Sequence, residues 1–230
     1  QWINMLRKKR VISFNAISHS QKREFEQAGI NIEGVVYHGI PTDRFSLDEN
    51  KSDYLFTIGT ISPEKGQHIA IEIAKKAGRP LIIAGEIHPV NEAYWEEMVR
   101  PYIDGDQIKF VGSKTDEEKI PLYQQAAALL FPIQWKEPFG LVMIESMACG
   151  TPVIAYSRGA VPEVVKDRET GFVIQETGNK EEDLEAMVKA INNLDTINSK
   201  ACRTHVEQNF NIQKEARDYL SLYKKLINSN

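Results

Sequence analysis

Short apolar runs alternate with helical patterns along most of the chain. Most of these runs are followed, after a turn rich in glycine, proline or polar residues, by a segment with helical periodicity. Strands and helices that alternate in this way predict an α/β fold, with a parallel sheet covered by helices on both faces. We expect strands at 54–58, 81–84, 108–111, 128–131, 153–155 and 172–174, and helices at 67–77, 92–103, 115–127, 140–148, 181–193, 198–208 and 212–227. We expect Pro101 to bend or end the helix at 92–103.

The pattern divides the chain into three parts. Residues 1–46 are too few to bury a core, and we expect them to be the remnant of a preceding domain plus a linker. Residues 47–195 hold the alternating pattern and form the main domain. Residues 196–230 are extra C-terminal helices that would pack back on the preceding domain. The chain begins with Gln1 rather than Met, so we expect a piece of a longer protein. In the first part we expect strands at 11–16 and 35–37 and a helix at 20–28.

Composition and charge narrow the class of protein. The 230 residues are 42% hydrophobic and 26% charged, which is typical of a soluble globular domain. No apolar run approaches the roughly 18 residues that a membrane span requires, although membrane association stays open. The net charge of −4 gives no basic footprint for nucleic acid, and the basic run 7–10 is interpreted as a surface patch.

The cysteines and histidines do not stand at metal-binding spacings. Cys149 and Cys202 lie far apart, and Cys149 follows an apolar helix, which suits a buried reduced thiol in a cytoplasmic protein. None of the five histidines belongs to an HExxH pattern, so we expect no metal. The chain also lacks GxGxxG and GxxxxGK[ST], which counts against an NAD fingerprint and a P-loop.

One predicted helix carries a carboxylate among apolar residues. The segment 140–148 is apolar on nearly every side, which indicates burial on every side. Glu145 stands in its middle, and it is the only charged residue between Glu137 and Arg158. A buried carboxylate without partners costs several kcal/mol. Glu145 is therefore either a structural group that caps a neighbouring loop or a carboxylate held inside a ligand-binding cleft.

The loops that follow the strands are the expected ligand site. Ligands of an open α/β sheet bind beyond the carboxyl ends of its strands. Lys65 stands at a helix start, where its charge opposes the helix dipole; a bound anion would explain it, and a solvated lysine is the alternative. Gly140, Leu141 and Val142 offer free N–H groups at the start of the apolar helix as a second anion site. We expect four loops to converge, at 59–66, 85–90, 112–115 and 132–139.

Two carboxylates beside these anion sites fit hydroxyl groups better than phosphates. Glu137 precedes the apolar helix and Glu145 lies two turns into it, where it could accept from the hydroxyls of a ribose. Lysine and amides for phosphate, with carboxylates for hydroxyls, together describe a nucleotide sugar. We interpret Trp135 as ordinary packing rather than a mobile lid.

These residues resemble a known family. Four segments are similar to the carboxy-terminal half of the retaining GT-B glycosyltransferases of family 4, the glycosyl transferases group 1. The resemblance spans roughly residues 30–195, and its most specific element is the glutamate pair within EPFGLVMIE. The segments are GTISPEKG (59–66), KFVGSKTDEEK (109–119), FPIQWKEPFGLVMIESMACGTPVIA (131–155) and GAVPEVV…TGFVI (159–174).

The resemblance implies a Rossmann-like domain that binds a nucleotide-diphosphate sugar. With an N-terminal acceptor domain it would transfer a hexosyl group with retention of configuration, without a metal or other cofactor. The implied catalytic residues are Glu137, at the sugar hydroxyls, and Lys65, at the diphosphate. Glu145 would hold the ribose and Lys119 would lie near the nucleoside. The implied donor-binding residues are Gly59, Thr60, Lys65, Gly112, Lys114, Lys119, Glu137, Phe139, Gly140, Leu141, Val142 and Glu145.

The chain departs from the family pattern in two ways. Thr60 stands where the family usually has arginine, so half of the usual cation pair for the diphosphate is absent. The acceptor domain is missing, so we expect this chain alone to be inactive. The alternatives are a stand-alone nucleotide or nucleotide-sugar binding module and a nucleotide-sugar epimerase. Without the acceptor domain, the last helix would expose apolar positions that could form a homodimer: Ala216, Tyr219, Leu220, Tyr223 and Leu226.

Overall fold

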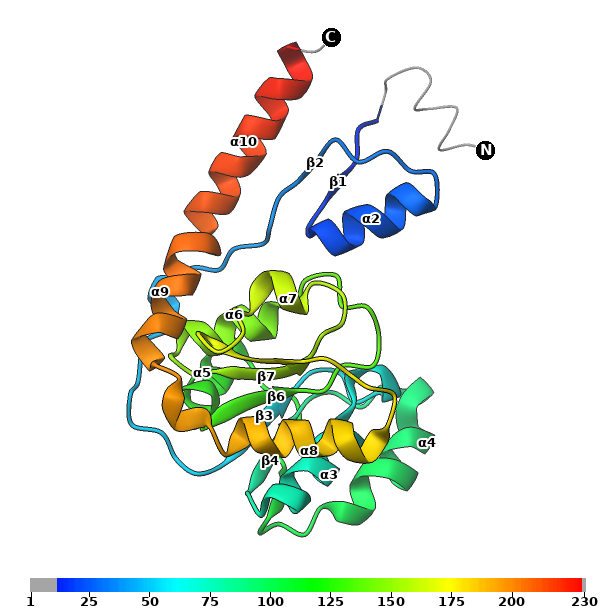
Figure 1. Ribbon diagram of the computed structural model, residues 1–230, viewed down its shortest axis with the longest axis vertical. Coiled ribbons are helices and arrows are strands. Elements are labelled where there is room, and N and C mark those ends of the chain that lie inside the picture. The colour runs from blue at the N-terminus through cyan, green and yellow to red at the C-terminus, as the bar shows by residue number, and fades with distance from the viewer. Residues whose placement is uncertain (1–11, 229–230) are drawn as a thin grey trace.

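The predicted alternation forms a six-stranded sheet in the computed structural model, which describes residues 12–228 (Figure 1). The basic run 7–10 and the predicted strand start at residue 11 lie outside the described residues. The strand order is β5-β4-β3-β6-β7-β8, and each pair of neighbours is parallel. All six carboxyl ends therefore meet at one edge of the sheet. The strands are β3 (Leu55–Ile58), β4 (Leu81–Ala84), β5 (Ile108–Phe110), β6 (Ala128–Phe131), β7 (Val153–Tyr156) and β8 (Gly171–Ile174).

Helices lie on both faces of this sheet (Figure 1), as the alternation predicts. The predicted helix 92–103 is not continuous: it divides into α4, a π-helical turn at Trp95–Val99 and a 3₁₀ turn at Arg100–Tyr102. Regular α-helical bonding ends at Tyr94, and Pro101, which has no N–H to donate, lies within the closing 3₁₀ turn. The helices after the first strand of this sheet are α3 (Gln67–Ala77), α4 (Glu92–Tyr94), α5 (Asp116–Gln125), α6 (Leu141–Ala148), α7 (Val161–Val164), α8 (Lys180–Ile191), α9 (Ser199–Asn209) and α10 (Ile212–Asn228).

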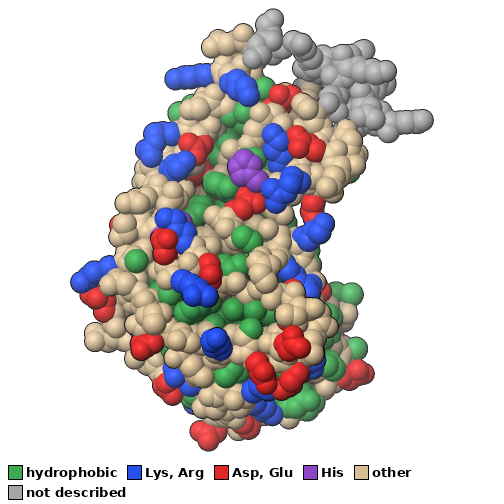
Figure 2. Space-filling model, viewed as in Figure 1, with side chains coloured by type: hydrophobic (Ala, Val, Ile, Leu, Met, Phe, Trp, Pro, Cys, Tyr) green, Lys and Arg blue, Asp and Glu red, His purple; other side chains and the backbone are tan. Residues whose placement is uncertain are grey.

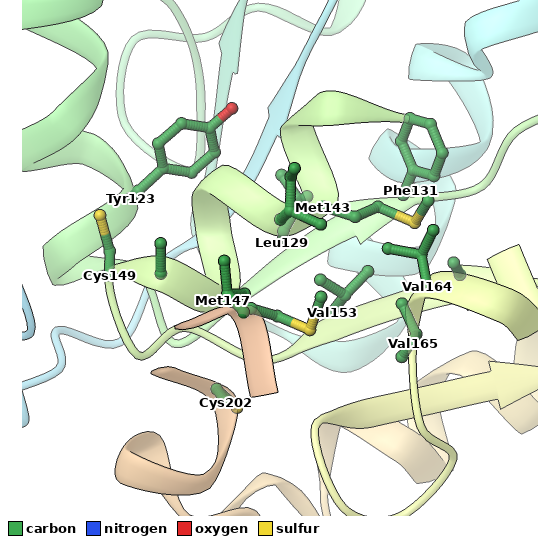
Figure 3. Close-up of a cluster of buried hydrophobic side chains, with 14 of the residues drawn as sticks. Tyr123, Leu129, Phe131, Met143, Met147, Cys149, Val153, Val164, Val165 and Cys202 are labelled. Atoms are coloured by element: carbon green, nitrogen blue, oxygen red, sulfur yellow. The ribbon is translucent and has the colours of Figure 1, made fainter. Parts of the chain in front are cut away.

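The core consists of two layers of apolar side chains, one on each face of the sheet. Along β6, Leu129 and Phe131 point into one layer, whereas Ala128 and Leu130 point into the other. This alternation is the period of two that a strand requires, and burial on both faces explains why β6 is a continuous apolar run. The first layer contains side chains from α6 and α9, including Met143, Met147 and Cys202 (Figure 3).

Helix α6 is buried along most of its length but not on every side. Leu141 in its first turn is 44% exposed, whereas residues 143–148 are buried, Glu145 among them. The expectation of complete burial is therefore wrong for the first turn. The exposed end is the N-terminus, which lies at the carboxyl edge of the sheet.

Residues before the main sheet form a small unit of their own. Strands β1 (Asn15–Ala16) and β2 (Gly34–Val35) pair in parallel, and α2 (His19–Gln27) lies between them in sequence. The hydroxyl of Ser18 caps α2 by accepting from the N–H of Gln21 at 3.0 Å. Both strands are shorter than the sequence pattern predicts.

Two elements of the main body hold this N-terminal unit. Glu163 of α7 accepts hydrogen bonds from the N–H groups of His19 and Ser20, at 2.8 and 2.7 Å, at the positive end of the α2 dipole. Helix α10 runs alongside the unit (Figure 1), and Leu222 packs against Gly34. Leu222 is 9% exposed although the predicted apolar face omits it, while Leu220 on that face is 57% exposed.

Neither a membrane span nor a metal cluster occurs within residues 12–228. No helix there combines the length and the apolar character needed to cross a bilayer. No group of three or more histidine, cysteine or acidic side chains in this range is placed to hold a metal ion.

Candidate functional site

Four loops converge at the carboxyl edge of the sheet, as the alternation predicts. Three backbone hydrogen bonds join them in pairs. Ile61 donates to Glu86 at 2.9 Å, Gly85 donates to Gly112 at 3.0 Å, and Gln134 donates to Glu64 at 2.7 Å. The loops after β3, β4, β5 and β6 therefore form one continuous surface.

Glu137 lies in the loop after β6 and is 7% exposed. Its backbone is held by the loop after β7: the N–H of Ala160 donates to the Glu137 carbonyl at 2.8 Å. A Cβ at Gly159 would lie 2.2 Å from that carbonyl oxygen, so the close approach requires glycine. This support for Glu137 was not predicted, because only the folded sheet brings the two loops together.

The carboxylate of Glu137 uses one oxygen for two protein contacts. Oε2 accepts from Lys65 Nζ at 2.9 Å and from Trp135 Nε1 at 3.0 Å. No hydrogen bond joins Oε1 to any residue in the described range. This second oxygen has both lone pairs available for the hydroxyl groups of a ligand.

Lys65 is the last residue of the 3₁₀ turn Pro63–Lys65 that precedes α3, and its side chain is 24% exposed. The sequence leaves two explanations for it, a bound anion or solvation, and the structure adds a third, the ion pair with Glu137. The ammonium also lies 4.9 Å from the centre of the Trp135 ring. Lysine and glutamate, which the sequence places in separate roles, are in direct contact.

Glu145 forms a second pair inside the protein. Its Oε1 accepts from Lys119 Nζ at 2.7 Å, and its Oε2 accepts from the hydroxyl of Tyr123 at 2.8 Å. Lys119 also pairs with Asp116 at 2.9 Å. Tyr123 was not among the predicted site residues. The sequence does contain a signal for it, because Lys119 and Tyr123 stand four positions apart on α5 and so share one face of the helix.

The pKa shifts in this pair have clear physical causes. Burial raises the pKa of Tyr123 well above its usual value, and the nearby Glu145 charge raises it further. Burial lowers the pKa of Lys119, but hydrogen bonds and attraction from Glu145 and Asp116 outweigh it, so the net shift is upward. The tyrosine is therefore a neutral donor, and the lysine is a cation at neutral pH.

The N-terminus of α6 begins beside Glu137. Gly140 has φ +86°, and a Cβ there would lie 2.6 Å from Met143 Cε and 3.4 Å from Glu137 Cγ. No side chain within residues 12–228 caps this helix, so the first-turn N–H groups of Leu141 and Val142 have no intrahelical acceptor. These amides follow Gly140, which lies beside Glu137, and the Glu137 carboxylate contacts the Lys65 ammonium.

The remaining predicted site residues lie on the loops after β3 and β5. A Cβ at Gly59 would contact Lys65 Cγ at 3.8 Å, and the Thr60 carbonyl accepts from Gln67 at 2.9 Å. Gly112, at φ +71°, faces open space. Lys114 lies on the third loop, 3.8 Å from Glu118.

Phe139 does not offer its side chain to the site. It is 2% exposed, and its ring packs 6.0 Å from the ring of Tyr37 and 5.4 Å from that of His38. The ring anchors the loop after β6 to the N-terminal unit. Only the backbone of Phe139 could therefore make the predicted contact with the nucleotide-sugar donor.

A cavity of about 550 Å³ lies between α2 and the loops after β6 and β7. Its walls mix cationic, acidic, amide and hydroxyl side chains, and Trp135 contributes an aromatic ring. Charges of both signs also mix over the visible surface of the described residues (Figure 2), which agrees with the lack of a basic footprint. The lining residues are Ser20, Arg23, Glu24, Gln27, Gln134, Trp135, Lys136, Ser157, Arg158 and Gly159.

Trp135 does not fit the expectation of ordinary packing. It is 42% exposed, so it is not ordinary packing, and its indole N–H contacts Glu137. Ser62 on the first loop is a second unexpected feature. Its buried hydroxyl has no hydrogen-bond partner among residues 12–228, and nothing in the structure explains this.

Comparison with known proteins places these loops in a family. The model of the family "Glycosyl transferases group 1" matches residues 39–209. The chain is 30% identical over 221 residues to the lipopolysaccharide core biosynthesis mannosyltransferase LpsB of Rhizobium meliloti, covering 84% of this chain and 61% of that protein. It is 30% identical over 197 residues to the D-inositol 3-phosphate glycosyltransferase of Rhodococcus erythropolis, covering 79% and 43%. The chain thus spans about half the length of these relatives.

Solved structures with this fold include glycosyltransferases. The Anabaena protein HepE, solved in complex with UDP and glucose, superposes with a TM-score of 0.79 at 22% identity, covering 96% of this chain and 65% of that one. AviGT4, a glycosyltransferase involved in avilamycin A biosynthesis, superposes with a TM-score of 0.76 at 23% identity, covering 94% and 64%. These likenesses show that the fold is that of GT-B glycosyltransferases.

Proposed function

Because the chain belongs to the glycosyl transferases group 1 family, we propose that it is the donor-binding part of a retaining, metal-independent hexosyltransferase. The donor is a nucleotide-diphosphate sugar. A separate acceptor-binding domain completes the enzyme, and this chain alone does not transfer sugar.

One observation carries the proposal. The Lys65–Glu137 pair lies next to Gly140, which precedes the uncapped first turn of α6, so a cation, a carboxylate and free amides are neighbours. The cation and the amides suit a diphosphate, because both stabilise negative charge. The carboxylate suits sugar hydroxyls, because it accepts hydrogen bonds and repels phosphate.

In this proposal each group has a defined role in transfer. The Oε1 atom of Glu137 accepts a hydroxyl of the donor sugar and holds the anomeric carbon toward the cavity beside α2. Lys65 and the amides of Leu141 and Val142 stabilise the diphosphate as the bond to the sugar breaks and negative charge develops on it. Glu145 accepts the ribose hydroxyls through the lone pairs that Lys119 and Tyr123 leave unused.

Binding of the donor changes the partners of Lys65. The ammonium contacts Glu137 at 2.9 Å in this structure, and a diphosphate offers it stronger charge-assisted acceptors. Lys65 then bridges the diphosphate and the carboxylate, which couples recognition of the two ends of the donor. Thr60, where the family usually has arginine, leaves Lys65 as the main cation of this loop.

The proteins of similar sequence and structure support the choice of ligand. The Anabaena structure holds UDP and glucose, and the Rhizobium relative is named a mannosyltransferase. A nucleoside diphosphate and a hexose are what these names contain, and a nucleotide-diphosphate sugar joins both in one ligand that suits the geometry of this site.

Calorimetric titration with UDP, GDP, ADP, UDP-glucose, GDP-mannose and ADP-glucose tests the proposal. We expect the compounds of only one of the three bases to bind. For that base, we expect Lys65→Met to weaken binding of the nucleoside diphosphate and of the nucleotide sugar by about tenfold, the effect of losing one charge-assisted contact. Lys166→Met is the matched control, because this lysine pairs with Glu169 away from the site. Absence of binding by all six compounds, or equal affinities for the two variants, would contradict the proposal.

A further inference from the structure

We propose that Trp135 positions Glu137 and forms the wall against which the donor sugar packs. The inference rests on the proposed function, because it assigns a further residue to the same sugar subsite. Three observations converge on this side chain: its hydrogen bond, its contact with Lys65 and its exposure to the cavity.

The hydrogen bond fixes the orientation of the carboxylate. Trp135 Nε1 donates to Glu137 Oε2 at 3.0 Å, on the oxygen that also accepts from Lys65. The indole N–H of tryptophan can donate one hydrogen bond and cannot accept one, so in this contact Trp135 is always the donor and Glu137 the acceptor. With two donors on Oε2, the plane of the carboxylate is set and Oε1 is directed away from them.

The aromatic ring also limits where the ammonium can lie. Lys65 Nζ is 4.9 Å from the ring centre of Trp135, within the range of a cation–π contact. The lysine therefore has two neighbours, the carboxylate and the ring, and Trp135 contacts both members of the pair. Loss of the ring would free Lys65 as well as Glu137.

Exposure gives the ring a surface for a ligand. Trp135 is 42% exposed and lines the cavity of about 550 Å³. Tyr123, the aromatic residue that donates to Glu145, is fully buried. An aromatic donor can therefore hold a glutamate without being exposed, so the exposure of Trp135 calls for another explanation. The C–H face of a sugar ring is apolar and packs on an aromatic ring while its hydroxyls bond to polar groups.

Two substitutions separate the roles of the N–H and the ring. Trp135→Phe keeps an aromatic ring and removes the donor, whereas Trp135→Leu removes both. We expect Trp135→Phe to weaken nucleotide-sugar binding about three- to tenfold, the net effect of one typical hydrogen bond, and to leave binding of the nucleoside diphosphate unchanged. We expect Trp135→Leu to weaken both forms, because Lys65 also loses its neighbour. Trp95→Phe is the control, since Trp95 packs on Phe110 at 4.5 Å, outside the cavity.

The indole N–H signals in a ¹⁵N-correlated NMR spectrum give a second readout. The chain has three tryptophans, and the Trp135 signal is assigned by its loss in Trp135→Phe. It should move in Glu137→Ala without any ligand, and it should move more with the nucleotide sugar than with the nucleoside diphosphate. The Trp95 signal should stay in place in both cases.

The outcomes distinguish this inference from the function on which it rests. If the unaltered chain binds a nucleotide sugar but both Trp135 variants bind it equally well, the inference is overturned and the proposed function stands. If the Trp135 indole signal does not move in Glu137→Ala, the positioning role is overturned, whereas the packing of Trp135 against the sugar is not. If the unaltered chain binds no nucleotide, the proposed function fails and this inference fails with it.

Discussion

Two carboxylates eight positions apart in the sequence are held by the same device in different surroundings. Glu137 and Glu145 are each 7% exposed, and each contacts one lysine and one aromatic donor. For Glu145 the donor is a buried tyrosine, and both oxygens are occupied. For Glu137 the donor is a half-exposed tryptophan, and one oxygen stays available.

The difference shows how one arrangement can hold a carboxylate mainly for stability at one place and leave an oxygen open to a ligand at another. The Lys119–Glu145 pair joins α5 to α6 in the core, where an unpaired charge is expensive. The Lys65–Glu137 pair contacts Trp135, which lines the cavity, and a ligand can replace one partner there at less cost. Substitutions at the Glu145 pair should therefore affect stability most, and those at the Glu137 pair should affect sugar binding most.

The largest effect on stability is expected from Glu145→Ala. This change leaves the Tyr123 hydroxyl and the Lys119 ammonium without their acceptor in a buried place, although Lys119 keeps Asp116. We expect the free energy of unfolding to fall by about 3 kcal/mol, measured by urea denaturation. Glu137→Ala is the comparison and should cost about 1 kcal/mol, because Lys65 can turn to solvent. Equal losses for the two variants would contradict the distinction between the pairs.

A smaller effect is expected from Gly140→Ala at the start of α6. The φ of +86° disfavours alanine, and the new Cβ would crowd Met143 and Glu137. We expect a loss of about 2 kcal/mol in unfolding free energy and weaker binding of the diphosphate. Gly178→Ala is matched in φ, also +86°, but has open space around it, so it should lose only about 1 kcal/mol and bind normally. If both variants bind alike, the start of α6 is not part of the binding site.

Glu137→Gln tests the sugar role without removing the side-chain shape. An amide can still accept a hydroxyl, but it lacks the charge that pairs with Lys65 and strengthens the bond to the sugar. We expect the affinity for the nucleotide sugar to fall about tenfold, while that for the nucleoside diphosphate changes less than about twofold. Calorimetry on both forms measures this ratio, and an unchanged ratio would show that the role of Glu137 is misassigned.

The smallest effect concerns Lys51, which forms no ion pair with a carboxylate among residues 12–228. Lys51 donates to the carbonyls of Gln124 and Cys149 and to the Thr151 hydroxyl, and burial lowers its pKa to about 8 from 10.5. The contrast with Lys119, whose pKa is raised, shows what the acidic partners of Lys119 contribute.

This depressed pKa predicts a pH dependence of stability. Between about pH 8 and 10.5 the unfolded chain binds a proton that the folded chain has released, so the Lys51 contribution makes stability rise with pH. We expect about 1 kcal/mol over this window after solvent screening. Urea denaturation of the unaltered chain and of Lys51→Met, at the two ends of this pH window, measures how much of the change in unfolding free energy comes from Lys51. An equal pH dependence for the two would contradict the assignment.

Local patterns predicted the sheet more reliably than the contacts of the site. Strands 81–84 and 128–131 were predicted with their observed bounds, because buried parallel strands are continuous apolar runs between turn residues. The expected bend or end at Pro101 is only part of the outcome at 92–103, because regular α-helix covers only Glu92–Tyr94 and continues as a π-helical turn and a 3₁₀ turn. The division into domains stays a prediction.

The sequence predicted which residues gather but not which ones touch. Both glutamates and Lys65 were predicted because unusual charges interrupt an apolar or glycine-rich segment. The contact of Glu137 with Lys65 spans 72 positions, and the approach of Gly159 to Glu137 depends on neighbouring strands. Trp135 was misjudged, because a single aromatic residue gives no sign of its exposure.

A crystal structure of the chain with the nucleotide sugar selected by calorimetry tests the central claim most directly. The account predicts the diphosphate within hydrogen-bond distance of Lys65 Nζ and the amides of Leu141 and Val142, with a sugar hydroxyl on Glu137 Oε1. A nucleotide bound elsewhere, with the Lys65–Glu137 contact unchanged and the start of α6 empty, would contradict it.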